Sequence, residues 1–197
     1  MSLNGLLIPA AIACSYLLGS VPTGLWLGLK LRNIDIRERG SRNIGATNTM
    51  RVLGKRLGIA TLAVDVLKGW LPVVVALWLN VWEYLPILCG LAAILGHTFS
   101  LFLWFRGGKG VATSTGVFLG LAPMPTLIAA AVFGVVVAAT RMVSAGSIAA
   151  AAALSVAVFF FPATTPVRVV TVAVAVLVIL KHRANVQRIL SGKESRI

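Results

Sequence analysis

Clusters of cationic and small polar side chains interrupt an otherwise apolar sequence. The first cluster follows residue 30 and mixes arginines with hydroxyl and amide side chains, namely Ser41, Arg42, Asn43, Thr47, Asn48 and Arg51. These groups stand beside glycines, which let the backbone approach an oxyanion closely. An ordinary basic loop would explain the arginines but not the uncharged members. The combination favours an anion-binding surface.

A second cluster is a glycine-rich turn with a central lysine that precedes a predicted helix. Its members are Gly107, Gly108, Lys109, Gly110 and Thr113. The start of a helix offers free backbone N–H groups and the positive end of the helix dipole, which together favour phosphate. The spacing is not that of a Walker loop, and a plain connecting turn is the alternative. His97, on the preceding helix, is interpreted as a supporting residue.

A third cluster occupies the C-terminal tail. His182, Asn185 and Arg188 follow one another at intervals of three residues and share one face if the last helix continues past Leu180. Glu194 follows and is interpreted as structural support. The alternative is a basic anchor whose charges reach the membrane surface. The spacing favours an imidazole, an amide and a guanidinium that project together.

Two further ionisable residues, Asp65 and Lys68, lie inside an apolar stretch and are neighbours on one helical face. Charges within a membrane span are costly and usually face a polar interior. We expect both side chains to point into the protein. A pair that merely neutralises itself and a functional pair are both compatible with the sequence.

The elements that position these residues are predicted to be membrane-spanning helices. The chain has 197 residues, a hydrophobic content of 58% and a mean hydropathy of +0.95, which exceed the range of soluble domains. We predict an all-α integral membrane protein, one domain over residues 1–197, with about seven helical pieces, some short or broken. The pieces are 3–29, 57–79, 84–105, 111–121, 125–140, 143–161 and 167–180, with a turn at the prolines of residues 122–125.

The distribution of positive charge predicts the orientation of these helices. The chain carries 18 Lys and Arg against 5 Asp and Glu, a formal net charge of +13. The basic segments are residues 30–56, 106–109 and the tail from residue 181. Since short basic loops remain in the cytoplasm, we predict an external N-terminus, a cytoplasmic C-terminus and all three clusters on the cytoplasmic side.

Six ordered motifs resemble those of the bacterial membrane glycerol-3-phosphate acyltransferases that use acyl phosphate as the donor. The motifs are Gly-Ser-X-Pro-X-Gly at 19–24, Gly-Ser-X-Asn-Ile-Gly-Ala-Thr-Asn at 40–48, Asp-X-X-Lys-Gly at 65–69, Gly-His-X-Phe at 96–99, Gly-Gly-Lys-Gly-Val-Ala-Thr at 107–113, and His-X-X-Asn-X-X-Arg with a later Gly-X-Glu at 182–194. The resemblance covers nearly the whole chain. Departures are small: Ser100 stands where the family often has proline, and Arg106 where lysine is common.

The resemblance implies transfer of a fatty acyl group from acyl phosphate to the sn-1 hydroxyl of glycerol 3-phosphate, at the cytoplasmic face of a bacterial inner membrane. The products are lysophosphatidic acid and inorganic phosphate. It assigns Lys109 with its glycines to one phosphate, and Ser41, Arg51, Asn185 and Arg42 to the other phosphate or the developing oxyanion. Lys68, Thr113 and Arg188 join the expected binding residues. His182 is the side-chain candidate for the base, and a phosphate oxygen of the donor is the alternative.

Other functional classes fit the sequence less well. A transporter of an anionic solute is the main alternative, but it predicts polar residues along a path to both faces. Nucleic-acid binding is not expected, since no aromatic residues interleave the basic ones. Cys14 and Cys89 lie in apolar runs, so we expect no metal site and no cofactor. We expect membrane lipid around the protein and no obligate protein partner.

Overall fold

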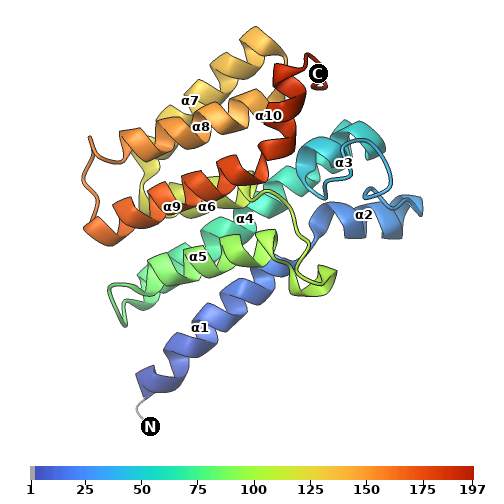
Figure 1. Ribbon diagram of the computed structural model, residues 1–197. Helices are drawn as coiled ribbons and strands as arrows, with labels where there is room; N and C mark the ends of the chain where they lie inside the picture. The colour runs from blue at the N-terminus through green and yellow to red at the C-terminus, as the bar shows by residue number, and fades with distance from the viewer. Residues whose placement is uncertain (1–2) are drawn as a thin grey trace. The chain divides into compact units, whose positions relative to one another are not determined.

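The computed structural model describes residues 3–197, so Met1 and Ser2 of the predicted domain lie outside the described residues. Within that range the chain is entirely helical (Figure 1), which confirms the predicted fold class. The elements are α1 (Leu3–Ser20), α2 (Thr23–Arg32), α3 (Ala46–Leu53), α4 (Lys55–Leu79), α5 (Leu85–Thr98), the 3-10 turn η1 (Leu101–Leu103), α6 (Val111–Leu121), α7 (Pro123–Thr140), α8 (Val143–Ala157), α9 (Thr165–Lys181) and α10 (Arg183–Leu190).

The helices form two compact units that divide between Gly120 and Leu121, at the end of α6. The predicted proline turn lies at this boundary, because α6 ends at Leu121 and α7 begins with Pro123 as its first residue. Proline suits the first position of a helix, where its missing N–H has no partner to lose. The predicted division of the 111–140 stretch into two helices is therefore confirmed.

In the first unit, α5 packs against both α1 and α4, and the short helices α2 and α3 pack on α4. The α1–α5 crossing is close because small residues face each other. A Cβ added to Gly19 would collide with the carbonyl oxygen of Ala93, and one added to Gly96 would collide with that of Tyr16. Small residues are the usual means by which membrane helices approach closely.

The first apolar piece, predicted as one helix over residues 3–29, is two helices. α1 and α2 meet at a 47° bend around Val21 and Pro22, so the single-helix prediction is wrong. The bend has specific support from distant residues: Ser100 Oγ donates to the carbonyl of Ser20 at 2.6 Å, and Lys68 Nζ donates to that of Val21 at 2.8 Å. These bonds satisfy carbonyls that a continuous helix would have used.

In the second unit, α8 packs between α7 and α9, and α10 contacts α8 and α9. The last apolar piece was predicted over residues 167–180, and a shared face for His182, Asn185 and Arg188 depended on the helix continuing past Leu180. α9 ends at Lys181 and α10 leaves it at 55°, so that condition is not met. In this bent arrangement Ser144 on α8 donates to Glu194 in the tail, 50 residues further along the chain.

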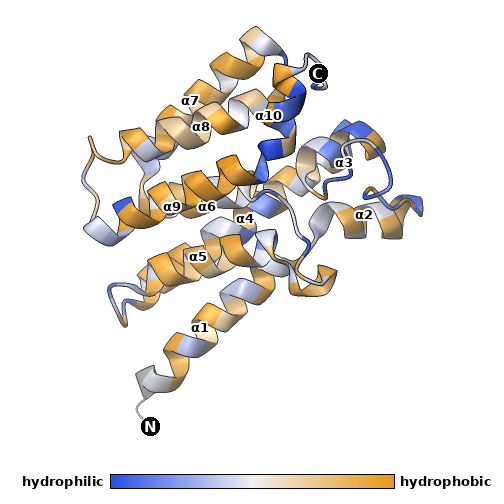
Figure 2. Cartoon of the chain, in the orientation of Figure 1, coloured by the Kyte–Doolittle hydropathy of each residue, from blue (hydrophilic) through white to orange (hydrophobic). Residues whose placement is uncertain are grey.

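The apolar helices have the dimensions of membrane spans. α4, α7 and the α5–η1 segment are each long and apolar enough to cross a bilayer, and the two bent pairs α1–α2 and α9–α10 raise the number to five if each is one span. α6 and α8 are apolar but shorter. Large apolar side chains are widely exposed, among them Trp78 and Phe160, as expected for surfaces that face lipid. Figure 2 shows these helices as predominantly hydrophobic and the loop between α2 and α3 as hydrophilic.

Candidate functional site

The loop between α2 and α3 is organised by one buried amide, that of Asn48. Its Nδ2 donates to the carbonyls of Ile36, Arg39 and Asn43 at 2.8–3.2 Å, and its Oδ1 accepts the N–H of Ser41 at 2.8 Å. Because these bonds engage both ends of the amide, Asn48 shapes the loop, and its assignment to substrate binding remains a prediction.

Of the predicted site residues in this loop, Ser41 and Arg42 are exposed, and Arg51 is exposed on the adjoining α3. Arg42 has a left-handed backbone with φ of 58°, next to Gly40 at 60°, so the chain reverses sharply at this point. Asn43 uses Oδ1 to accept the N–H of Gly45, and Thr47 is half-buried on α3. The first predicted cluster therefore divides into a scaffold and a hydroxyl with two guanidinium groups at the surface.

The glycine-rich turn is bonded to the end of α5. Gly108 N–H donates to the His97 carbonyl at 3.0 Å, and Gly107 N–H donates to that of Thr98 at 3.2 Å. We had expected these N–H groups to be free for phosphate, and both are engaged within the protein. The expected donors at this turn are consequently the Lys109 ammonium and the start of α6, where the helix dipole is positive.

Both of the first two glycines are required by contact with His97. A Cβ at Gly107 would collide with the His97 carbonyl oxygen, and one at Gly108 would collide with its Nε2. The turn thus lies directly on the histidine, and its supporting role remains a prediction.

Three buried hydroxyls surround the start of α6. Thr98 Oγ1, Thr113 Oγ1 and Ser114 Oγ have no hydrogen-bond partner within residues 3–197. The Cβ that Gly110 lacks would lie 3.1 Å from Thr98 Oγ1 and 3.8 Å from Ser114 Oγ. Buried hydroxyls are normally bonded, so this group is suited to donate to a bound oxyanion. Sequence reasoning included Thr113 and missed Thr98 and Ser114, because a lone hydroxyl on an apolar helix usually bonds its own backbone.

The Asp65–Lys68 pair lies in the interior of the first unit, as predicted. Lys68 Nζ is 2.8 Å from Asp65 Oδ1, and Thr23 Oγ1 donates to the same oxygen at 3.2 Å. His97 Nδ1 lies 3.9 Å from it. Because Lys68 also bonds the Val21 carbonyl, its ammonium is directed into the α1–α2 bend. Its assignment to substrate remains a prediction, and this geometry favours a structural role.

In the second unit, the carboxylate of Glu194 collects three donors. Ser144 Oγ and Asn185 Nδ2 each donate to Oε1 at 2.7 Å, and Arg188 Nε donates to Oε2 at 2.7 Å. Burial raises the pKa of Glu194, but the three hydrogen bonds and the charge of Arg188 outweigh it and leave the pKa below its usual value. Ser144 was not singled out from the sequence, because nothing local connects it to the tail.

His182 lies at the corner between α9 and α10 and is buried. Its Nδ1 is 2.8 Å from the carbonyl of Val178. A carbonyl only accepts, so Nδ1 carries the proton in the neutral ring and Nε2 holds the lone pair. Asn185 and Arg188 both bond Glu194, and His182 lies at the bend just before the helix that carries them.

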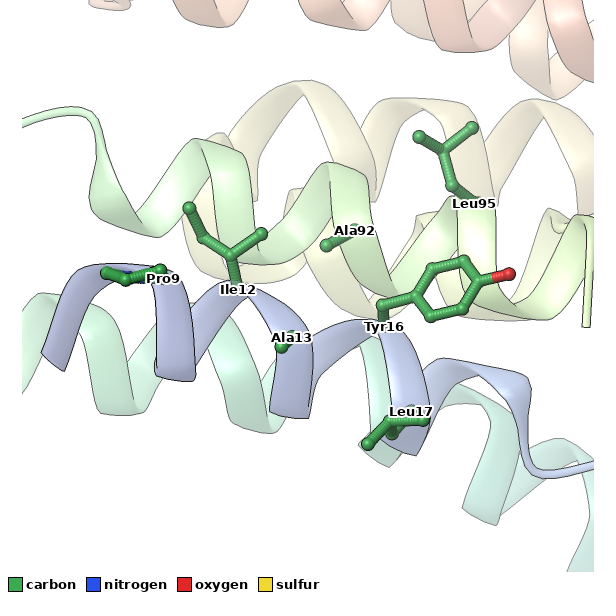
Figure 3. A pocket seen from close by; sticks show the side chains of 7 residues that line it. All are labelled: Pro9, Ile12, Ala13, Tyr16, Leu17, Ala92 and Leu95. Atoms are coloured by element: carbon green, nitrogen blue, oxygen red, sulfur yellow. The ribbon is translucent and has the colours of Figure 1, made fainter. Parts of the chain in front are cut away.

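An open apolar groove of about 600 Å³ runs between α1 and α5 in the first unit (Figure 3). Its lining is apolar: Pro9, Ile12, Ala13, Tyr16, Leu17, Ala92 and Leu95. Leu95 is two residues before His97, and the Tyr16 hydroxyl donates to the Phe99 carbonyl at 2.6 Å. One end of the groove is therefore close in sequence to His97, the residue that the glycine-rich turn contacts.

Fold and side chains together define a helical membrane protein whose polar side chains gather in loops and at helix ends. Among the described residues no group of three or more His, Cys, Asp or Glu is placed to hold a metal ion. The family model for glycerol-3-phosphate acyltransferase matches residues 9–192. The chain belongs to this family, which confirms the resemblance drawn from the motifs.

Relatives and solved structures agree with that assignment. The glycerol-3-phosphate acyltransferase of Trichlorobacter lovleyi is 52% identical over 185 residues, covering 94% of this chain and 95% of the relative. That of Geobacter metallireducens is 54% identical with the same coverage. The crystal structure of PlsY (YgiH), an integral membrane glycerol 3-phosphate acyltransferase, in its glycerol 3-phosphate form has a TM-score of 0.91 at 34% identity, covering 96% of this chain and 95% of that one. Its lysophosphatidic acid form has a TM-score of 0.88.

Proposed function

We propose that the chain transfers a fatty acyl group from acyl phosphate to the sn-1 hydroxyl of glycerol 3-phosphate, at the cytoplasmic face of a bacterial inner membrane. The names of its relatives supply the acceptor, and the crystal forms of PlsY contain glycerol 3-phosphate and lysophosphatidic acid. The acyl-phosphate donor, the sn-1 position and the orientation follow from the sequence resemblance and the charge distribution. We further propose that both units act as one catalytic domain without a cofactor or an obligate protein partner.

One observation carries the proposal: the buried carboxylates are paired internally, while cations remain at the surface. Asp65 is held by Lys68, and Glu194 by Arg188, with 3% and 8% of their side chains exposed. Ser41, Arg42 and Arg51 are exposed, and the half-buried Lys109 lies two residues before α6. Both proposed substrates carry phosphate, which requires cations and hydrogen-bond donors without competing carboxylates.

The proposed reaction breaks the bond between the acyl carbon and the donor phosphate oxygen and forms an ester bond to the sn-1 oxygen. The hydroxyl proton is removed by His182 or by a phosphate oxygen of the donor, and inorganic phosphate leaves. Lys109 and the hydroxyls at the start of α6 would hold one phosphate. Ser41, Arg51 and Asn185 would hold the other phosphate or the developing oxyanion. The apolar groove between α1 and α5 would take the acyl chain.

The test is phosphate release and product formation by protein purified in lipid mesophase or detergent. Palmitoyl phosphate and glycerol 3-phosphate are supplied together and singly, and lysophosphatidic acid is identified by mass spectrometry. We expect turnover only with both substrates, and its loss in Lys109→Ala. Lys55→Ala removes an exposed lysine outside every cluster and should retain activity.

Palmitoyl thioesters of coenzyme A and of acyl carrier protein test the donor. Equal turnover with a thioester would overturn the acyl-phosphate assignment and leave the acceptor intact. No turnover by folded protein with any donor would favour the transport of an anionic solute.

A further inference from the structure

A hollow of about 560 Å³ in the first unit belongs to none of the clusters described above. Its lining consists of Arg37, Leu103, Trp104 and Arg106. Arg37 comes from the loop after α2, and the other three come from the connection between α5 and α6. Two guanidinium groups therefore share a hollow with an indole and an aliphatic side chain.

The backbone holds aromatic rings outward beside this hollow. Trp104 and the following Phe105 both have left-handed φ values, 52° and 62°, which large side chains rarely adopt. Phe105 N–H bonds the Ser100 carbonyl at 2.8 Å and Arg106 N–H bonds that of Leu103 at 3.0 Å, so the turn is firmly held. As a result Trp104 is 87% exposed and Phe105 56%. Exposing two large aromatic rings to water is unfavourable, whereas aromatic rings are common at the interface between a bilayer and water.

The neighbouring helix continues the same pattern of rings and cations. Phe102 packs on Trp26 of α2 with ring centroids 5.5 Å apart, and Lys30 Nζ lies 5.8 Å from the Trp26 ring. These contacts bring aromatic and basic side chains of α2 close to the aromatic side chain of η1 in the first unit. Trp and Tyr with flanking Lys and Arg mark the headgroup region in membrane proteins.

The net charge of the residues around the hollow is positive, even though two acidic residues lie among them. Asp35 binds Arg37 through both carboxylate oxygens, with Nη2 to Oδ2 at 2.6 Å, and this pairing lowers the pKa of Asp35. The pair fixes the guanidinium while half of the Arg37 side chain stays exposed. Residues 30–39 and 106 contain two acidic residues, Asp35 and Glu38. The same residues contain more basic ones, namely Lys30, Arg32, Arg37, Arg39 and Arg106. An anion is the complementary ligand.

We propose that this hollow binds the phosphate headgroup of an anionic phospholipid, between Arg37 and Arg106, with Leu103, Trp104 and Phe105 against its glycerol and upper acyl carbons. A soluble anion would explain the arginines but not the exposed rings. A neutral lipid would explain the rings but not the arginines. The assignment is independent of the acyltransfer chemistry, since none of the five residues is among those proposed to act on substrate.

The experiment is native mass spectrometry of the purified chain in detergent, titrated with phosphatidylglycerol and, separately, with phosphatidylcholine. We expect tighter binding of phosphatidylglycerol and a weakening of that binding with added salt. Arg106→Gln and Arg37→Gln should each weaken it about fivefold, the effect of one surface cation on an anionic lipid. Trp104→Ala should weaken binding of both lipids. Arg106 has no part in the Asp35 pair, so its variant serves if Arg37→Gln disturbs the loop.

Arg56→Gln is the matched control, because it removes one exposed arginine of the same basic region outside the hollow. It should bind phosphatidylglycerol like the unaltered chain. If Arg56→Gln and Arg106→Gln weakened phosphatidylglycerol binding equally, binding would depend on net charge alone, and the proposed site would be wrong. Displacement of the lipid by millimolar inorganic phosphate or glycerol 3-phosphate would also overturn it, because the hollow would then recognise phosphate alone.

Discussion

Lys68 Nζ lies 2.8 Å from Oδ1 of Asp65, one turn earlier on α4, and both side chains are almost fully buried. The pair connects three elements, because Lys68 also bonds the Val21 carbonyl at the α1–α2 bend and Asp65 accepts a bond from Thr23 on α2. A buried charge without its partner is far more costly than the intact pair. The pair therefore stabilises the bend as well as itself.

Lys68→Met is expected to lower the free energy of unfolding by about 3 to 5 kcal/mol, because it leaves Asp65 buried and unpaired. The double variant Asp65→Asn with Lys68→Met should lose clearly less than the sum of the two single changes. Thermal unfolding in detergent, analysed as a double-mutant cycle, measures this coupling. Strictly additive losses would mean that the two charges do not stabilise each other.

The contact of the glycine-rich turn with His97 gives a prediction with an internal control. Gly108→Ala places a methyl group on the His97 ring, whereas Gly107→Ala places one on the His97 backbone carbonyl. Both changes should lower the melting temperature and the rate of phosphate release. His97→Ala removes the ring but not the carbonyl, so it should restore much of the melting temperature of Gly108→Ala and none of that of Gly107→Ala. Equal rescue of both variants would show that the turn does not lie on the imidazole.

The sequence was sufficient for features that local residues determine. Two nearby prolines predicted the break between α6 and α7, and the apolar stretch around Asp65 and Lys68 predicted an inward-facing pair. The bend within the predicted helix 3–29 was not foreseen. The α1–α2 bend depends on Ser100 and Lys68, 80 and 47 residues away from the carbonyls they bond. Such partners become visible only when the helices are packed.

The same limit applies to the candidate site. Asn48 is predicted to contact substrate because amides suit oxyanions, and its hydrogen bonds to Ile36, Arg39, Ser41 and Asn43 show that it also organises the loop. A shared face for Arg188 and His182 depended on a helix continuing past Leu180, and the sequence did not reveal that Arg188 bonds Glu194. Residue type indicated where polar side chains gather. It did not indicate which of them are bonded to one another within the protein.

The carboxylate of Glu194 should make the tail sensitive to acid. Its folded pKa lies below the usual value, so its contribution to stability is complete above the unfolded pKa of about 4.3 and is lost as the pH falls through the folded pKa. We expect the melting temperature of the chain to fall below about pH 4.3, and that of Glu194→Gln to fall less steeply over the same range. Asp35 also has a lowered pKa but is common to both proteins, so their difference isolates Glu194. Parallel curves would contradict this prediction.

The groove between α1 and α5 should set the length of the acyl chain. Ala13 lines it, so Ala13→Trp should lower kcat/KM for palmitoyl phosphate about tenfold or more while octanoyl phosphate is affected less. Ala63→Trp, on the exposed side of α4, is the control and should leave the ratio of the two substrates unchanged. A uniform loss for both chain lengths in Ala13→Trp would place the acyl chain elsewhere.

The position of His182 favours a substrate oxygen as the group that accepts the hydroxyl proton. The imidazole is buried at the α9–α10 corner, and its Nδ1 bonds the Val178 carbonyl one turn earlier, so the ring supports the bend that brings Asn185 to Glu194. We expect His182→Gln to lower kcat while the low-pH limb of the kcat/KM profile remains, because the donor phosphate still titrates. If the ring were the base, kcat would fall by about 10² to 10⁴ and that limb would disappear. Measuring the full pH profile of both proteins separates a residue that holds the corner from one that takes the proton.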